Sequence, residues 1–411
     1  MLADVSTRPT STRLVGREAE FATLCDALKR ARAGEPAAVL VGGEAGVGKT
    51  RLVEEFLGHA EAGETRVLTG QCLELGEEGP PFAPFAAALR DLLRRAGPEV
   101  FSGHEQEFAR LLPELGPVGP EAVVDAQRGS LFELVAGLFA RLAADRTLVF
   151  VVEDLHWADR STRDLIAFLV RSARTARALL LCTYRSDELH RGHPLRPFLA
   201  ELDRVRDVQR LDLDRLDRDG TGEILAQLLG DEQPAGVVDN IHERAQGNPF
   251  FTEELAACSA ATGCVDMSDS LRDLLLTRVD SLAEPAQRIL RIAAAGAAAR
   301  IGHELLAEVA ELPLAELENA LRLAVAAQLL VADPDGGYEF RHALVREAVH
   351  EDLLPGEHAR LHARYAAAIE ARPQLVPAGD APAELAHHWH AAGDLPRALA
   401  AAVRAAGAAG Q

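Results

Sequence analysis

The first half of the chain alternates short apolar runs with amphipathic stretches of helical spacing. The apolar runs have the length and composition of buried strands at residues 39–41, 147–152 and 178–184, and residues 65–75 read as a further strand with its exit. The amphipathic stretches predict helices at 14–31, 50–57, 85–95 and 131–143, whereas the proline-containing region 96–126 reads as irregular. Strands that alternate with helices imply a parallel sheet covered on both faces. The pattern therefore predicts an α/β fold, with Ser161 capping the helix after the third apolar run.

From about residue 211 the pattern changes to short helices. The helical stretches are 218–230, 234–245, one that begins at 247–251, 285–295, 303–310 and 314–328. Residues 329–333 and 337–341 flank a Pro-Asp-Gly turn, which predicts a β-hairpin. Three helices followed by a hairpin form a winged-helix pattern. A long helix at 357–371, a proline-rich break at 373–382 and alanine-rich helices complete the sequence. Because the chain stops inside a helix, we expect residues 1–411 to be part of a longer protein.

Composition limits the classes of function. At 411 residues, with 48% hydrophobic residues, the chain should hold two to four domains. It has no apolar run of 18 residues and no charged-then-apolar leader, so we expect no membrane contact and a cytoplasmic location. The net charge of −20 opposes binding of a nucleic-acid backbone, so any contact with DNA needs another segment.

A glycine-rich turn follows the first apolar run. Gly43, Gly48, Lys49 and Thr50 complete the pattern G-x-x-x-x-G-K-[ST] between a predicted strand and a predicted helix. Glycines let the backbone wrap an anion closely, and the helix that follows points its free N–H groups at the phosphates. Lys49 is expected to reach the β- and γ-phosphates, and the Thr50 hydroxyl to bind Mg²⁺. Only one other lysine, Lys29, occurs in the sequence, which suggests a specific role for Lys49.

Charged side chains follow the next two buried strands. Glu153 and Asp154 end the strand at 147–152, where a nucleotide hydrolase needs one carboxylate for Mg²⁺ and one for the attacking water. The sequence does not say which carboxylate takes which role. Arg185 ends the strand at 178–184 and could contact the γ-phosphate. In open parallel sheets this edge binds ligands.

Two other features are weaker. Pro249, in the segment GNPF, could pack on an adenine ring or merely start a helix. His358 with His362, and His387 with His388 and His390, could suggest metal sites. The first pair has no third ligand and no intervening glutamate of the zinc-protease type, so the sequence favours ordinary surface histidines in both groups.

The order of six segments resembles the ATPase core of large LuxR-type transcriptional regulators, which belong to the STAND class of AAA-like ATPases. The segments are LVGRE (14–18), GGEAGVGKT (42–50), VVEDLHWAD (151–159), LCTYRSDEL (181–189), GNPFFTEEL (247–255) and FRHALVREAVHEDL (340–353). The resemblance covers roughly residues 12–370. It implies a flexible leader (1–13), a P-loop nucleotide-binding domain (14–210), a helical lid (211–280), a winged-helix domain (281–355) and the start of a helical, TPR-like arm (356–411).

The resemblance also implies roles for matching residues. Glu153, Asp154, Lys49 and the sensor arginine Arg185 would be catalytic, and Thr50 would join the two carboxylates at Mg²⁺. His342 would touch the ADP β-phosphate and lock a closed form. The full set expected at the nucleotide is Val15, Gly16, Arg17, Gly43, Glu44, Ala45, Gly46, Val47, Gly48, Lys49, Thr50, Arg51, Pro249 and His342.

The resemblance implies a slow, Mg²⁺-dependent ATPase switch. ADP would hold a closed state, whereas ATP with a small-molecule or protein inducer would favour an open, self-associating state. The expected DNA-binding helix-turn-helix and most of the repeat sensor are absent from the sequence. Two alternatives stay open: an AAA-like motor or chaperone, and an ATPase module fused to another output such as a nucleotide cyclase.

Overall fold

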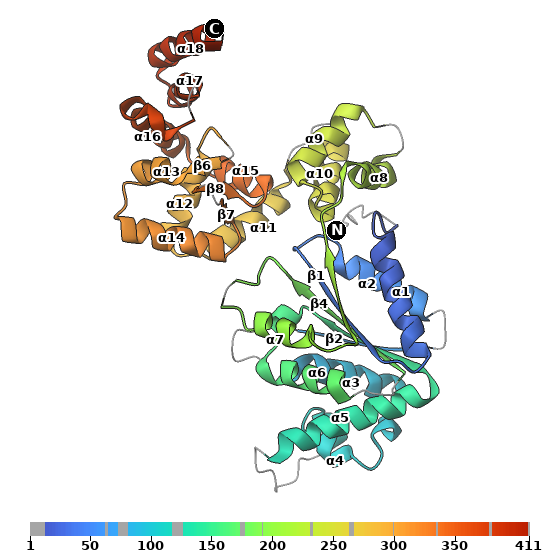
Figure 1. The fold of residues 1–411 in the computed structure, drawn as a ribbon. Helices are drawn as coiled ribbons and strands as arrows, with labels where there is room; N and C mark the ends of the chain where they lie inside the picture. The colour runs from blue at the N-terminus through green and yellow to red at the C-terminus, as the bar shows by residue number, and fades with distance from the viewer. Residues whose placement is uncertain are drawn as a thin grey trace, which may run out of the picture. The chain divides into compact units, whose positions relative to one another are not determined.

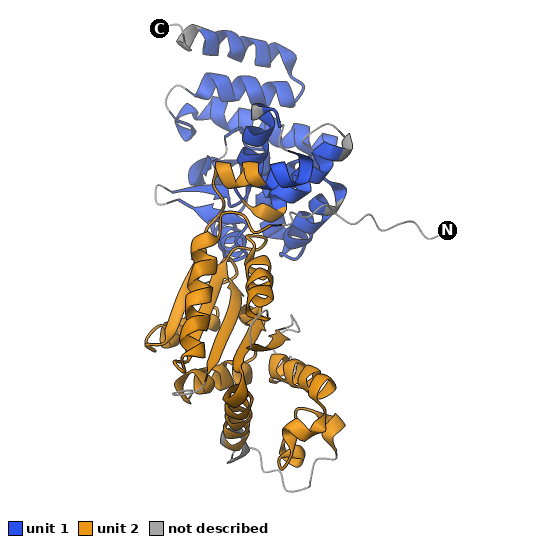
Figure 2. Ribbon diagram, turned by 90° about the vertical axis from the view of Figure 1, so that its right-hand side faces the viewer, with its two compact units in different colours: residues 1–10, 224–247, 251–411 blue, residues 11–223, 248–250 orange. Residues whose placement is uncertain are grey.

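The computed structural model describes most of the chain. The described residues are 13–61, 65–72, 81–116, 126–172, 177–190, 192–230, 233–262, 267–298, 300–333, 336–377 and 380–409. They form two compact units (Figure 2). Unit 2 contains the described residues up to 223 together with 248–250, and unit 1 contains the others from 224 onwards.

Unit 2 is built on a sheet of five parallel strands in the order β2-β3-β4-β1-β5. The strands are β1 (Ala37–Gly43), β2 (Thr65–Gln71), β3 (Thr147–Glu153), β4 (Ala178–Arg185) and β5 (Val208–Leu213). Because β4 lies between β1 and β3, the ends of these three strands are neighbours at one edge of the sheet. That edge carries the predicted phosphate loop, acidic pair and arginine, and the predicted parallel α/β fold is confirmed.

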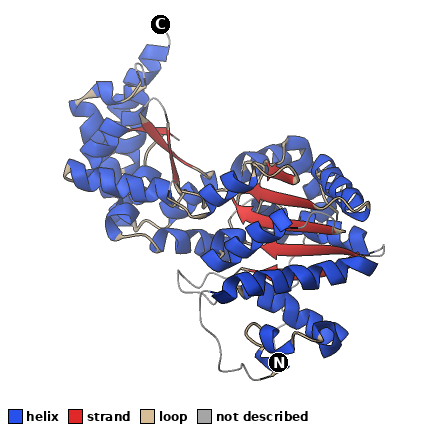
Figure 3. Ribbon diagram, turned by 60° about the horizontal axis from the view of Figure 1, so that its bottom comes forward, coloured by secondary structure: helices blue, strands red, loops and turns tan. Residues whose placement is uncertain are grey.

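Helices cover both faces of the sheet (Figures 1 and 3). On one face, α1 (Glu18–Arg32) and α2 (Lys49–Glu61) pack on alternate strand residues such as Val39 and Val41. On the other face, Leu40 joins a core whose helices are α3 (Ala83–Ala96), α5 (Ala126–Asp145), α6 (Arg160–Ser172) and α7 (Leu195–Leu202). Burial on both faces explains why β1, β3 and β4 read as continuous apolar runs.

Three local predictions for unit 2 need correction. The edge strand β5 was not predicted, because only its last residue is buried and Gln209, Arg210 and Asp212 break the apolar pattern. The region predicted to be irregular contains η1 (Pro98–Phe101), α4 (Glu105–Phe108) and η2 (Pro113–Leu115).

The third correction concerns the start of α6. The cap is Asp159 rather than Ser161, because an Asp159 carboxylate oxygen accepts a hydrogen bond from the backbone N–H of Thr162 at 3.1 Å. The Thr162 hydroxyl donates to the same carboxylate. Ser161 lies inside the first turn of the helix, where its hydroxyl cannot take the capping position.

Unit 1 is mainly helical. Its first helices are α8 (Arg218–Leu229, from residue 224), α9 (Ala235–Ala245), α10 (Pro249–Thr262, from residue 251) and α11 (Asp269–Asp280). They are followed by α12 (Glu284–Ala294), α13 (His303–Ala310), α14 (Leu314–Ala326), α15 (Ala343–Glu351), α16 (Pro355–Ala371), η4 (Pro373–Leu375), α17 (Ala381–Ala391) and α18 (Leu395–Ala409).

A small antiparallel sheet completes unit 1. Its strands β6 (Arg300–Gly302), β8 (Gly337–Phe340) and β7 (Leu330–Ala332) lie in that order. The predicted hairpin is confirmed by the pairing of β7 with β8, although two residues of its turn, 334 and 335, lie outside the described residues. Neither α11 nor β6 was predicted from the sequence. None of the helices in the described parts of the chain has the length and apolarity needed to cross a membrane.

Candidate nucleotide site

The loop between β1 and α2 has the backbone of a phosphate cradle. Gly46 and Gly48 have φ angles of +77° and +102°, which L side chains rarely adopt. A Cβ at Gly46 would lie 2.8 Å from Cβ of Phe250 and 2.9 Å from Oδ1 of Asn248. At Gly48 a Cβ would meet no described atom within 4 Å. The Cβ direction is therefore blocked by Phe250 and Asn248 at Gly46, although this glycine is exposed, and it is open at Gly48, just before the N-terminus of α2.

Lys49 is buried at the start of α2 and bends back over the loop. Its Nζ donates hydrogen bonds to the carbonyl oxygens of Gly43 at 2.8 Å and Glu44 at 2.7 Å. Burial lowers the pKa of Lys49 to about 8, while the charge of Asp187 opposes this shift. Asp187 is itself buried, and its Oδ1 has no hydrogen-bond partner among the described residues. The lysine is thus held beside a carboxylate that the sequence analysis did not identify.

The acidic pair lies at the end of β3, as predicted. Glu153 is half-buried, and burial together with the charges of Asp154 and Glu54 raises its pKa. Asp154 has a left-handed backbone with φ of +55°, and its N–H donates to the Thr183 hydroxyl at 3.1 Å. A bound divalent cation would offset the repulsion among these carboxylates, so the donor set fits Mg²⁺.

Arg185 lies directly across the strand pair from the phosphate loop, since it pairs in register with Gly43. Its Nη1 donates to Oε1 of Glu188 at 2.7 Å, and its guanidinium lies 5.0 Å from the centre of the Trp157 ring. The backbone N–H of Arg185 donates to Nδ1 of His156 at 3.3 Å. Arg185 is therefore positioned at the loop, with its charge paired to a neighbouring glutamate.

His156 supports this arrangement as a neutral side chain. Burial, followed by the charges of Arg185 and Lys49, lowers the pKa of His156 to about 3. A neutral ring leaves Nδ1 able to accept the hydrogen bond from Arg185. Although Oε2 of Glu188 lies 3.3 Å from Nε2 of His156, burial outweighs that attraction.

Arg17 ties the phosphate loop to the segment that follows β5. Its Nη2 donates to the carbonyl oxygens of Val47 at 3.2 Å and Asp214 at 2.5 Å, and only 4% of the residue is exposed. Val15 is buried, and Gly16 has a φ of +61°. This element, which the resemblance places at the nucleotide, is thus hydrogen-bonded to the loop itself through Arg17.

The GNPF segment (residues 247–250) is also hydrogen-bonded to the phosphate loop. Asn248 Nδ2 donates to the Ala45 carbonyl oxygen at 2.9 Å, and the Phe250 N–H donates to the Gly46 carbonyl oxygen at 3.2 Å. Pro249 stands between these two anchors as the first residue of α10. His342 belongs to unit 1, where its ring meets Phe251 edge to face with 5.5 Å between ring centres.

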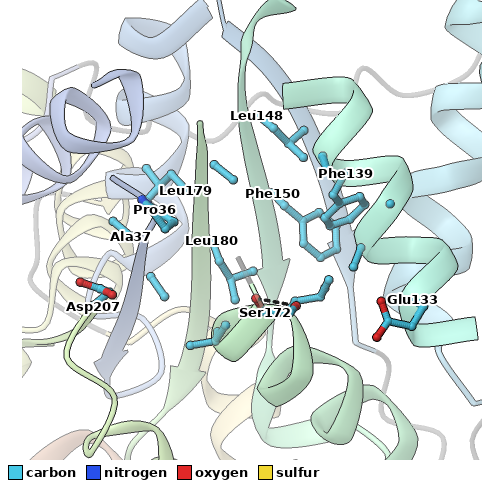
Figure 4. Close-up of a pocket in the computed structure, with 17 residues that line it drawn as sticks. Pro36, Ala37, Glu133, Phe139, Leu148, Phe150, Ser172, Leu179, Leu180 and Asp207 are labelled. Carbon is cyan, nitrogen blue, oxygen red and sulfur yellow. Dashed lines mark hydrogen bonds between the residues drawn. The ribbon is translucent and has the colours of Figure 1, made fainter. Parts of the chain in front are cut away.

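Among the hollows of unit 2, two differ clearly in character. One of about 590 Å³ lies beside the phosphate loop and is lined by residues that include Gly43, Glu44, Asp212 and Arg215. The other, of about 330 Å³, is mostly apolar and lies at the opposite edge, where β3 and β4 begin (Figure 4). The charged side chains expected at the nucleotide lie at the edge of the sheet that carries the phosphate loop, beside the larger of these two hollows.

Comparison with known proteins identifies the domain. Residues 13–182 match the AAA ATPase domain family. The chain contains an AAA-like P-loop ATPase domain. A protein of Rhizobium meliloti (strain 1021) is 26% identical over 428 residues, which cover 94% of this chain and 40% of the relative. The chain thus spans less than half the length of that relative.

Two solved structures give a measure of the fold. A Walker-type ATPase of Pyrococcus abyssi is 16% identical with a TM-score of 0.55, covering 85% of this chain and 99% of its own. This likeness shows the P-loop ATPase fold alone. A STAND protein with a tetratricopeptide repeat sensor from Pyrococcus horikoshii is 16% identical with a TM-score of 0.39, covering 95% of this chain and 50% of its own. That score is too low to support an inference.

The residues of the ATPase domain fit a magnesium nucleotide. P-loop ATPases use a lysine, backbone N–H groups and a hydroxyl at the phosphates, together with carboxylates at the metal. Here the loop, Lys49, the exposed Thr50 and the pair Glu153 and Asp154 supply each of these groups. Arg51 follows in the first turn of α2.

Several neighbours of the site could not be found from the sequence pattern. Thr183 fixes the Asp154 backbone, and Gln71 Nε2 donates to Asp154 Oδ2 at 3.2 Å. Glu44 forms an ion pair of 2.9 Å with Arg215. These contacts join residues that lie 29, 83 and 171 positions apart, so no local sequence motif indicates them.

Proposed function

We propose that this chain is the nucleotide-binding core of a STAND-type regulatory switch, of the kind found in large LuxR-type transcriptional regulators. It binds ATP or ADP with Mg²⁺ and hydrolyses ATP slowly. The AAA-like ATPase domain and the order of the sequence motifs support this proposal. The output helix-turn-helix lies outside residues 1–411, so DNA binding belongs to another segment.

One observation carries the proposal: residues 248–250 are hydrogen-bonded to the phosphate loop at Ala45 and Gly46. These three residues group with the ATPase domain, whereas the residues before and after them group with unit 1. A change in the loop's phosphate contacts therefore acts directly on the chain segment that leads into α10. A regulatory ATPase needs such a link between its nucleotide and the rest of the protein.

Each site residue has a role in this proposal. Lys49 and the loop N–H groups bind the phosphates, and Thr50 with one carboxylate of the acidic pair holds Mg²⁺. The other carboxylate orients the attacking water. Arg185 exchanges Glu188 for the γ-phosphate and so distinguishes ATP from ADP. A bound nucleotide supplies the negative charge that draws Lys49 away from the loop carbonyls.

The remaining roles concern unit 1. Residues 211–280 act as the lid, with Pro249 against the base, and 281–355 act as a winged-helix domain whose His342 binds the ADP β-phosphate. Residues 356–411 begin a helical, TPR-like arm. The protein acts in the cytoplasm. ADP favours its closed form, and ATP with an inducer favours self-association. The ligand shifts this balance only through its different affinities for the two forms.

The test is steady-state phosphate release with excess ATP and Mg²⁺. The wild type is expected to turn over at about 10⁻² s⁻¹ or more slowly, as regulatory NTPases do, and Lys49→Ala to abolish turnover. Lys29→Ala is the matched control, because Lys29 is the other lysine of the chain and is exposed beside Asp26. A rate of about 1 s⁻¹ or faster without any inducer would contradict the switch and favour a motor.

A further inference from the structure

Five histidines gather where three helices of unit 1 meet. His350 lies on α15, His358 and His362 on α16, and His387 and His388 on α17. In the sequence the pair His358 and His362 lacks a third ligand, but folding brings His350 and the α17 histidines to His362. The sequence-based objection to a metal site therefore does not hold in the structure.

The ring nitrogens are close enough to share one ion. In the group His350, His358 and His362, one nitrogen from each residue lies within 4.8 Å of the others. Tetrahedral zinc with Zn–N bonds of about 2.0–2.1 Å separates its nitrogens by about 3.4 Å. His358 and His362 are one helical turn apart, and their ring centres are 4.3 Å apart. Coordination of one ion therefore requires the ring nitrogens to approach one another more closely than in the ion-free structure.

His362 has the hydrogen-bonding pattern of a metal ligand. Only 2% of the residue is exposed, and its Nδ1 lies 2.8 Å from Nδ1 of His388, which is fully buried. One of these nitrogens must carry the proton and the other accept it. If His362 donates, its Nε2 holds a lone pair, and that Nε2 has no hydrogen-bond partner among the described residues. Metal-bound histidines typically donate their second N–H in this way.

Two charged side chains bear on the binding of a cation by the group. Nearby charges partly cancel, because Arg346 opposes a cation and Glu351 favours one. Neutral imidazole nitrogens are ligands for zinc and similar divalent ions rather than for Mg²⁺ or Ca²⁺.

We propose that His350, His358 and His362 form a binding site for one zinc-class divalent ion, with His388 orienting His362 as its hydrogen-bond partner. The site joins α15 to α16 directly and α17 through His388. It is separate from the nucleotide site and does not depend on the proposed ATPase function. The competing explanation is a set of neutral histidines packed as ordinary core residues.

The test uses the whole chain, purified without a histidine tag, stripped with a chelator and titrated with ZnCl₂. The wild type is expected to bind one Zn²⁺ per chain and to gain thermal stability on binding. Removal of a hydrogen-bond partner around a metal commonly lowers affinity about 10–100-fold, so removal of a ligand should lower it by at least about 100-fold. His350→Ala and His358→Ala are the preferred variants, because both residues are only half-buried and their replacement should leave the fold intact.

Two exposed histidines of α17 serve as controls. His390→Ala should leave zinc affinity within about threefold of the wild type, because His390 belongs to neither group. The ligand assignment predicts the same result for His387→Ala. Co²⁺ bound to the wild type should give visible absorption bands that His358→Ala removes. The proposal is overturned by absent binding, by binding that survives both His350→Ala and His358→Ala, or by loss on His387→Ala alone.

Discussion

The amide of Asn248 donates a hydrogen bond to the Ala45 carbonyl oxygen at 2.9 Å, joining residues that are 203 positions apart in the chain. Asn248 is fully buried, and its Oδ1 also accepts the Phe250 N–H at 3.1 Å. The side chain therefore fixes the GNPF segment and the phosphate loop together. This relationship holds a segment of unit 2 that is distant in sequence against the phosphate loop.

Loss of the hydrogen bond between Asn248 and Ala45 should weaken nucleotide binding. We expect Asn248→Ala to speed ADP dissociation by about 10-fold, corresponding to a buried hydrogen bond of about 1–1.5 kcal/mol. Release of a fluorescent ADP analogue measures the rate. Asn240→Ala, on the exposed side of α9, is the control and should leave the rate unchanged. Equal rates for both variants and the wild type would show that the segment does not act on the loop.

Gly46 should tolerate a side chain less well than another glycine with a left-handed backbone. Gly34→Ala places a Cβ in open space at a φ of +87°, so it should cost about 1–2 kcal/mol of unfolding free energy. Gly46→Ala adds the clash with Phe250 and should cost at least about 1 kcal/mol more. Urea unfolding monitored by Trp157 in a Trp389→Phe background reports on unit 2. Equal losses for the two variants would contradict the blocked Cβ direction at Gly46.

The lowered pKa of Lys49 predicts pH-dependent binding. With a pKa of about 8 in the free protein, Lys49 is charged below that pH and becomes neutral above it. Because phosphates bind the charged form, ADP affinity should fall between pH 8 and 9 by up to about tenfold. Titration calorimetry without Mg²⁺ measures the effect. Lys49→Arg should bind more weakly but with a flat profile over this range, because a guanidinium stays charged.

The start of α6 distinguishes the sequence-based cap from the observed one. Asp159→Ala removes the carboxylate that accepts the Thr162 N–H and should lower the free energy of unfolding by about 1–2 kcal/mol. Ser161→Ala should change it by less than about 0.5 kcal/mol. The same tryptophan-monitored urea unfolding compares them. The reverse ranking would restore Ser161 as the cap.

The sequence predicted what depends on local pattern. The strands that carry Gly43, Glu153 and Arg185 are buried on both faces, so their apolar runs were recognisable. Parallel alternation with helices then placed these three residues at one edge of the sheet. The edge strand β5 escaped prediction because it alternates exposed charges with few buried residues.

Contacts between distant parts of the chain could not be predicted. The electrostatic interaction of Asp187 with Lys49 and the hydrogen bond between Asp154 and Thr183 depend on the strand order β3-β4-β1, which no local pattern encodes. The clustering of the histidines of α15, α16 and α17 likewise could not be predicted from the sequence. Their sequence spacing argued against a metal site, and only the packing of three helices brings their ring nitrogens together.

The most direct measurement of the central claim is the nucleotide that the purified chain already holds. Protein is denatured, and the released nucleotide is identified and quantified by chromatography. The switch predicts close to one ADP per chain for the wild type and for Lys29→Ala, and none for Lys49→Ala. Empty sites in the wild type, or a guanine nucleotide in place of ADP, would contradict it.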